Sequence, residues 1–179
     1  LRAMRDYIVL ATLLGAGPRR EELSTLTFSS LKRLPTGTGY RDVLEITGKG
    51  DKTRPVPISP LLSQRFREWE KITGGGNVAR SINKSGKLGN SLSAFGIFCI
   101  VREYGALIGL PNLDPHDCRR SFGRLGYDAT HDIMLIKDLL GHADVKTTQT
   151  YIGLHLKLDI TASDFIIRAT EFFGKVSGD

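Results

Sequence analysis

Two short apolar runs on either side of a glycine-rich turn constrain the fold more than any other feature of this sequence. The runs are residues 43–46 and 56–58, and the turn between them is Gly-Lys-Gly-Asp at 48–51. Branched apolar residues flanking such a turn predict a β-hairpin with Lys49 at or beside its turn. Pro55, just before the second run, and Pro57 within it have no N–H to donate to a ladder, so this strand should lie at an edge. The predicted sheet is therefore small.

The remaining pattern is helical. Apolar residues recur at helical spacing, glycines end helices, and Asp or Thr residues begin them. In the first part of the chain, helices are predicted at 2–14, from 19, at 61–69 and at 92–108; the short helix from 19 gives way to a glycine- and proline-rich stretch at 35–39. Four more helices are predicted after these. One begins at Asp114, one is capped by Thr130 and reaches Leu140, one is capped by Asp144 and reaches Ile152, and the last has an apolar face at Phe165–Phe173. A third strand is expected near Val78. We thus expect a fold that is mainly α with a small antiparallel β-sheet.

Composition narrows the class of protein. The 179 residues suffice for one domain, and a formal charge of +6 suits a polyanionic partner, although many basic proteins bind no nucleic acid. No apolar run approaches the roughly 20 residues needed to cross a bilayer. Cys99 and Cys118 are not spaced as a metal knuckle or redox pair, so we expect a reducing, cytoplasmic setting. The chain begins at Leu1 rather than methionine, and we expect it to be a fragment of a longer protein.

Asp114-Pro115-His116-Asp117-Cys118-Arg119 is the most informative segment. With Asp114 as N-cap and Pro115 at the first helical position, His116 and Arg119 share one face near a helix N-terminus. Unpaired backbone N–H groups and the helix dipole favour phosphate there. A solvated turn in which His116 and Arg119 have no function is the alternative.

Three further segments contain candidate functional residues. Arg19 and Glu22 share one face at a helix start, where the carboxylate can hold the guanidinium as a two-pronged phosphate clamp. Gly141 ends a helix and leaves His142 in the tight turn beyond it, able to donate to an anion. Tyr151 lies on the short helix that follows. Taken singly, each has an ordinary explanation: a surface ion pair, a capping histidine and a packing tyrosine.

Taken in order, these residues resemble the catalytic domain of the tyrosine recombinase or phage integrase family. The resemblance covers nearly the whole chain. It rests on Gly17-x-Arg19-x-x-Glu22-Leu23, Gly48-Lys49-Gly50-x-Lys52-x-Arg54-x-x-Pro57, His116-x-x-Arg119, Leu140-Gly141-His142 and Tyr151. It implies the DNA breaking-rejoining fold and double-stranded DNA as the partner. It also implies that residues 1–179 are the catalytic domain of a longer recombinase whose N-terminal DNA-binding domain is absent.

The resemblance also implies roles for these residues. Tyr151 would attack a DNA phosphate to give a 3′-phosphotyrosine, and Arg19 and Arg119 would stabilise the phosphate without a metal. Lys49 would protonate the leaving 5′ oxygen, His116 would help to take the tyrosine proton, and His142 would donate to the phosphate. No cofactor or metal would be needed. The activity would be site-specific recombination, and the favoured use is DNA integration by a phage or mobile element. The protein would form tetramers on DNA through the C-terminal helix.

Pro18 and Arg20 depart from the family pattern, which usually has apolar residues there, but proline can still open a helix. Two other functions remain open: a topoisomerase of the same chemistry, and a non-catalytic DNA-binding module. A zinc site fails on spacing. The residues considered for it are His116, Cys118, His131 and His142.

Overall fold

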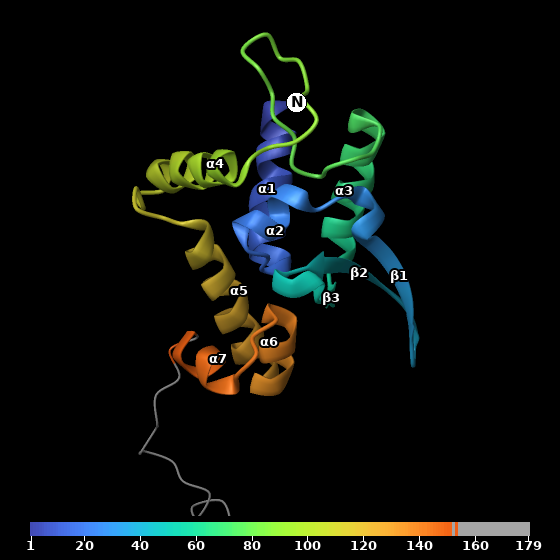
Figure 1. Ribbon diagram of the computed structural model, residues 1–179, viewed down its shortest axis with the longest axis vertical. Helices are drawn as coiled ribbons and strands as arrows, with labels where there is room; N and C mark the ends of the chain where they lie inside the picture. Colours follow the sequence, from blue (N-terminus) through green and yellow to red (C-terminus); the bar gives the residue numbers. More distant parts are fainter. Residues whose placement is uncertain (152, 154–179) are drawn as a thin grey trace, which may run out of the picture.

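The computed structural model describes residues 1–151 and 153. Within them the chain forms seven α-helices and one three-stranded antiparallel sheet, so the expected fold class is confirmed (Figure 1). The predicted helix at 165–173 lies outside the described residues. None of the helices in the described part is both long and apolar enough to cross a membrane.

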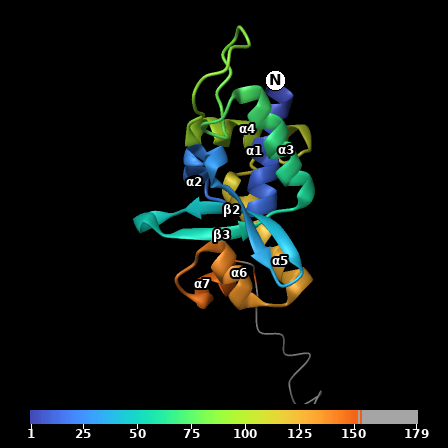
Figure 2. The same cartoon turned by 90° about the vertical axis from the view of Figure 1, so that its right-hand side faces the viewer.

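Helix α1 (Arg2–Ala16) is the centre of the larger part of the molecule. It contacts α3 (Pro60–Thr73), α4 (Ala94–Leu107) and α5 (Pro115–Thr130), which surround it in Figures 1 and 2. Its buried face joins one continuous core, and among the largest side chains fully buried there are Ile8, Leu13, Phe66 and Trp69. The helix ends where Gly17 adopts a left-handed conformation with φ 60°, close to the predicted stop.

The sheet has the order β1-β2-β3, made by β1 (Leu31–Thr36), β2 (Gly39–Thr47) and β3 (Thr53–Pro57). The β2–β3 hairpin and the edge position of β3 confirm the prediction. Strand β1 was not expected, because residues 35–39 were assigned to a loop. Its side chains are half-buried or exposed, so no apolar alternation marks it. Its backbone pairing with β2 alone makes it a strand.

Two other predictions were wrong. No strand forms at Val78, whose N–H instead makes a single hydrogen bond of 2.8 Å to the carbonyl of Leu26. Thr130 does not cap a helix, since it is the last residue of α5. The cap of α6 (Ile133–Leu140) is Asp132, which accepts from two backbone N–H groups. Asp144 does cap α7 (Val145–Tyr151) as predicted, through the N–H of Lys146.

Helices α6 and α7 form a smaller unit below the main body (Figure 1). Ile136 and Leu140 are its buried apolar residues, and Phe122 of α5 packs against both this cluster and the main core. The β2–β3 hairpin lies between α2 (Arg20–Thr25) and α6 in Figure 2, and β3 contacts α6. The junction of α2, β3, α5 and α6 is therefore where residues distant in sequence meet.

Candidate active site

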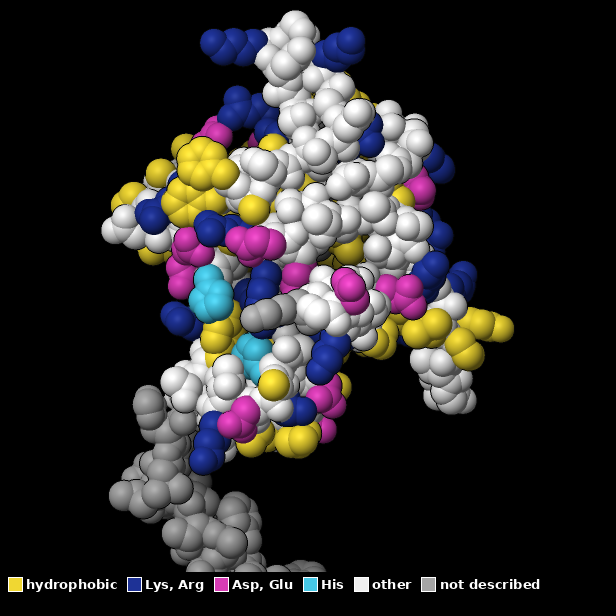
Figure 3. Space-filling model, in the orientation of Figure 1, with side chains coloured by type: hydrophobic (Ala, Val, Ile, Leu, Met, Phe, Trp, Pro, Cys, Tyr) yellow, Lys and Arg dark blue, Asp and Glu magenta, His cyan; other side chains and the backbone are white. Residues whose placement is uncertain are grey.

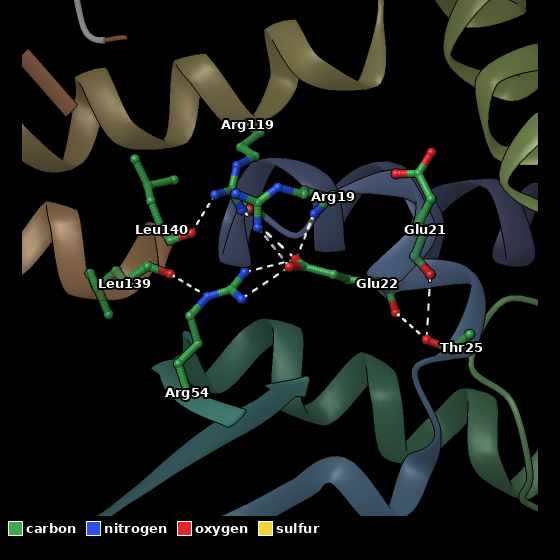
Figure 4. Close-up of polar contacts among 9 residues, drawn as sticks. Arg19, Glu21, Glu22, Thr25, Arg54, Arg119, Leu139 and Leu140 are labelled. Atoms are coloured by element: carbon green, nitrogen blue, oxygen red, sulfur yellow. Dashed lines mark hydrogen bonds and ion pairs between the residues drawn. The ribbon is translucent and has the colours of Figure 1, made fainter. Parts of the chain in front are cut away.

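Glu22 is the centre of the polar network at this junction (Figure 4). Arg19 is the N-cap of α2, and its backbone N–H donates to Oε2 of Glu22 at 2.8 Å while its guanidinium Nη1 donates to Oε1 at 2.9 Å. The contact expected between these two side chains is thus present. Glu22 is only 7% exposed, so its carboxylate is isolated from solvent and depends on these donors.

Arg54 of β3 is the residue that the sequence analysis missed. It appeared there within the hairpin pattern but was given no role. Its Nη2 and Nη1 donate to the Oε2 and Oε1 of Glu22 at 2.8 and 3.1 Å, and its Nε donates to the carbonyl of Leu139 at 2.8 Å. A signal was available, because Arg54 shares a strand face with Val56, which is fully buried. An arginine on a buried face requires a carboxylate partner.

Arg119 is almost completely buried, with 1% exposure. Its Nη1 donates to the carbonyl of Gly17 at 2.6 Å, its Nη2 donates to the carbonyl of Leu140, and it lies 3.8 Å from Glu22. Its Nε has no hydrogen-bond partner among the described residues. Burial and the neighbouring charge of Arg19 lower the pKa of Arg119 to about 10, so it remains a cation at neutral pH.

His116 lies in the first turn of α5, as predicted. Asp114 caps this helix by accepting from the N–H of His116 at 2.8 Å, and the Asp117 carboxylate accepts from the backbone N–H of Asp114 at 3.0 Å. Burial, followed by the positive charges of Arg120 and Arg119, lowers the pKa of His116. Its ring is therefore neutral at pH 7 and can accept a proton.

His142 lies in the turn after α6, where Gly141 adopts the left-handed conformation with φ 63°. The imidazole is 9% exposed, and its Nδ1 lies 3.0 Å from the hydroxyl of Thr148. Burial and then the charge of Arg119 lower the pKa of His142 to about 4. A neutral imidazole thus lies beside the arginines.

Tyr151 is the last residue of α7, and its ring lies between two histidines. Ring centroids are 5.0 Å from His116 and 5.1 Å from His142, both edge-on, and the guanidinium of Arg120 lies 5.5 Å above the ring. The hydroxyl donates to the backbone carbonyl of His116 at 3.2 Å. Burial raises the pKa of Tyr151 even though Arg119 and Arg120 act to lower it.

Two hollows meet at Arg19. One, of about 750 Å³, is lined among others by Gly48, Lys52 and His142, and the other, of about 300 Å³, by His116 and Arg119. In Figure 3, histidine side chains reach the surface beside Lys and Arg side chains at the narrow waist of the molecule. Such a cationic hollow suits a phosphate.

Lys49 is placed where the sequence predicted it. It is the first residue of the short 3-10 turn η2 (Lys49–Asp51) between β2 and β3, and its neighbour Gly48 lines the larger hollow. Five of the six residues proposed for catalysis, all but Lys49, therefore meet through described side-chain contacts or shared hollows. No group of three or more His, Cys, Asp or Glu side chains in the described part of the chain could hold a metal ion.

Comparison with known proteins shows which family this chain resembles over most of its length. The model of the phage integrase family matches residues 1–157. Tyrosine recombinase XerC of Haemophilus influenzae is 32% identical over 155 residues, which are 86% of this chain and 50% of the relative. Tyrosine recombinase XerA of Pyrococcus horikoshii is 32% identical over 154 residues, 86% of this chain and 52% of the relative. The chain thus spans about half the length of these curated relatives.

Solved structures show the same fold. The XerH site-specific recombinase bound to its difH substrate, in a pre-cleavage complex, matches with a TM-score of 0.69 and 24% identity over 87% of this chain and 44% of that one. The Tn1549 transposon integrase in complex with circular intermediate DNA matches with a TM-score of 0.61 and 23% identity, over 92% of this chain and 59% of that one.

Proposed function

The chain belongs to the phage integrase family, and from this membership we propose that it performs site-specific DNA recombination by cutting and rejoining strands, with Tyr151 as the nucleophile. One observation carries the proposal: in a single chain, the Tyr151 ring lies between the His116 and His142 rings, next to the buried guanidinium of Arg119. A tyrosine that only filled space would not need two histidines and an arginine around it.

The arginines provide the phosphate-binding charge. Arg19 lines both hollows, and Arg119 lines the smaller one with its Nε unpaired among the described groups. Donors fixed in advance around a developing charge stabilise a phosphoryl-transfer transition state, each by about 3–4 kcal/mol. Glu22 and Arg54 do not need to touch the phosphate in this scheme, because they hold Arg19 and the end of α6 in place.

The reaction would exchange one phosphoester for another. The Tyr151 oxygen attacks the phosphorus, the bond to the 5′ oxygen breaks, and a 3′-phosphotyrosine and a free 5′-hydroxyl result. His116 takes the phenolic proton, Lys49 supplies a proton to the leaving oxygen, and His142 donates to a non-bridging oxygen. Rejoining reverses these steps. The ester energy is conserved in the intermediate, so no nucleotide cofactor is consumed.

The wider biological role is a further part of the proposal. We propose that the chain supplies the catalytic domain of an integrase carried by a phage or mobile element, and that double-stranded DNA is its substrate. The family description, together with the fold shared with a transposon integrase seen on DNA, supports this use. Assembly into a tetramer through the segment after Gly153 is part of the same proposal and lies outside the described residues.

Covalent trapping tests the proposal directly. The protein would be mixed with nicked duplexes built on the sequences it selects from a randomised DNA library, and the mixture denatured with detergent. We expect protein to remain on the 3′ phosphate, and Tyr151→Phe to abolish the adduct while DNA binding persists. Tyr40→Phe is the matched control, because Tyr40 is exposed at the far β1–β2 hairpin and should leave the adduct unchanged.

Other outcomes would identify other functions. Tight, salt-sensitive binding without any adduct would indicate a DNA-binding module instead. Relaxed plasmid without exchanged ends would indicate a topoisomerase.

A further inference from the structure

Thr148 is a buried polar residue outside the set proposed for catalysis. It lies in the middle of α7 with no exposed surface, and its hydroxyl is 3.0 Å from Nδ1 of His142. Four other helical threonines of this chain donate to the carbonyl four residues earlier. These are Thr12, Thr25, Thr73 and Thr130. In the described structure, the side chain of Thr148 bonds only to His142.

This single contact decides which group donates. A threonine hydroxyl has one hydrogen, and burying that hydrogen without an acceptor is destabilising. If Nδ1 carried the imidazole proton, it would donate to the hydroxyl, and the hydroxyl hydrogen would have no acceptor among the described residues. If the hydroxyl donates, Nδ1 is the acceptor and no buried hydrogen is left unpaired. The second arrangement is therefore the stable one.

The consequence concerns the other ring nitrogen. Because burial and Arg119 lower the pKa of His142 to about 4, the ring is neutral at pH 7 and carries one proton. With Nδ1 bare, that proton is on Nε2. His142 lines the larger hollow together with Arg19, so Nε2–H is the donor available to a ligand there.

We propose that Thr148 is a positioning residue that holds neutral His142 in the Nε2–H tautomer, ready to donate to the phosphate. The contact between His142 and a phosphate rests on the proposed function, whereas the tautomer of His142 does not. Thr148 also lies one helical turn before Tyr151, whose ring is 5.1 Å from that of His142. The same hydrogen bond therefore joins the phosphate donor to the helix that bears the nucleophile.

Nitrogen-15 NMR of the imidazoles tests the tautomer in the protein without DNA. Long-range proton–nitrogen correlations at pH 7 distinguish a protonated nitrogen from a bare one, and His142→Gln identifies the His142 signals among the four histidines. We expect the wild type to show Nε2–H. Thr148→Val, which keeps the shape and removes the hydroxyl, should shift the population toward Nδ1–H, and Thr148→Ser should restore Nε2–H. An Nδ1–H tautomer in the wild type would overturn the inference, even if no variant folds.

Strand cleavage provides the functional readout. On the nicked trapping duplexes, Thr148→Val should form adduct about tenfold more slowly, the equivalent of one net hydrogen bond, with unchanged DNA affinity and with rescue by Thr148→Ser. If Thr148→Val changed neither the tautomer of His142 nor the rate of adduct formation, the positioning role would be refuted. An adduct formed by the wild type would still support the proposed function. Absence of an adduct in the wild type would refute the proposed function alone, since the NMR result stands without it.

Discussion

Replacing Arg54 should destabilise this protein far more than replacing an exposed arginine. Arg54→Met removes two charge-assisted hydrogen bonds to Glu22 and one to the Leu139 carbonyl, from a side chain only 11% exposed. Leaving a buried charge without its partner costs about 3–5 kcal/mol. Glu22 keeps its two bonds from Arg19, so we expect the lower end, about 3 kcal/mol. For a domain of this size, that lowers Tm by about 6–12 °C.

The assay is urea unfolding followed by tryptophan fluorescence. Trp69 is the only tryptophan and is fully buried, so its emission reports loss of the core. The matched control is Arg65→Met, because Arg65 forms a similar 2.8 Å pair with Glu68 while 42% exposed. Exposed pairs contribute less than about 1 kcal/mol. If Arg54→Met cost no more than Arg65→Met, the structural role given to Arg54 would be wrong.

The same variant has a predicted pH dependence. Burial acts to raise the pKa of Glu22, but the hydrogen bonds from Arg54 and from the Arg19 backbone outweigh it, so the net pKa is lowered. A lowered acid pKa means that this stabilisation is present above the ordinary glutamate pKa and is lost as pH falls through the folded value. The difference in unfolding free energy between wild type and Arg54→Met should therefore narrow in acid. A constant difference would argue against the Glu22 pair as its source.

Three further predictions concern the turns and the proposed base. His131→Gly should raise the free energy of unfolding by about 0.5–1 kcal/mol in the same urea assay, because His131 has a φ of 54° that glycine adopts without strain; a lower value would contradict this. Gly141→Ala should cost about 1–2 kcal/mol, because φ is 63° and a Cβ would stand 3.0 Å from Cδ of Arg54; wild-type stability would show that the turn tolerates a side chain. The rate of adduct formation should decline as pH falls below the ordinary histidine pKa, because burial and Arg120 lower the pKa of His116 and a protonated His116 cannot take a proton. The His116→Gln variant should lose this pH dependence. If the variant kept it, the base would be another group.

Local chemistry explains which parts of the fold could be predicted from sequence. Gly17, Asp114 and Gly141 each mark a helix end through a conformation or hydrogen bond that depends on neighbouring residues only. The predicted cap at Thr130 was wrong because α5 continues through Thr130, and Asp132 accepts from the first N–H groups of α6 instead. Strand pairing also depends on distant partners, so β1 could not be read from exposed side chains.

In the candidate site too, contacts between residues close in sequence could be predicted, and contacts between distant residues could not. Arg19 and Glu22 are three residues apart on one helix turn, and their contact follows from spacing alone. Arg54 reaches Glu22 across 32 positions of sequence, and its partnership with Leu139 spans 85. These contacts exist only once β3 lies between α2 and α6. The bond between Thr148 and His142 likewise forms only because the turn after α6 brings the two residues together.

In the proposed reaction, the arrangement without substrate keeps Tyr151 protonated. One carboxylate, Glu22, faces the guanidinium groups of Arg19, Arg54 and Arg119, which leaves an excess of positive charge. Meanwhile the Tyr151 hydroxyl donates to a backbone carbonyl, and burial raises its pKa, so the phenol keeps its proton. A bound phosphate would balance the excess positive charge of the arginines and offer the tyrosine oxygen an electrophile. In the proposed reaction, attack would require the hydroxyl to leave the His116 carbonyl and give its proton to the ring of the same residue.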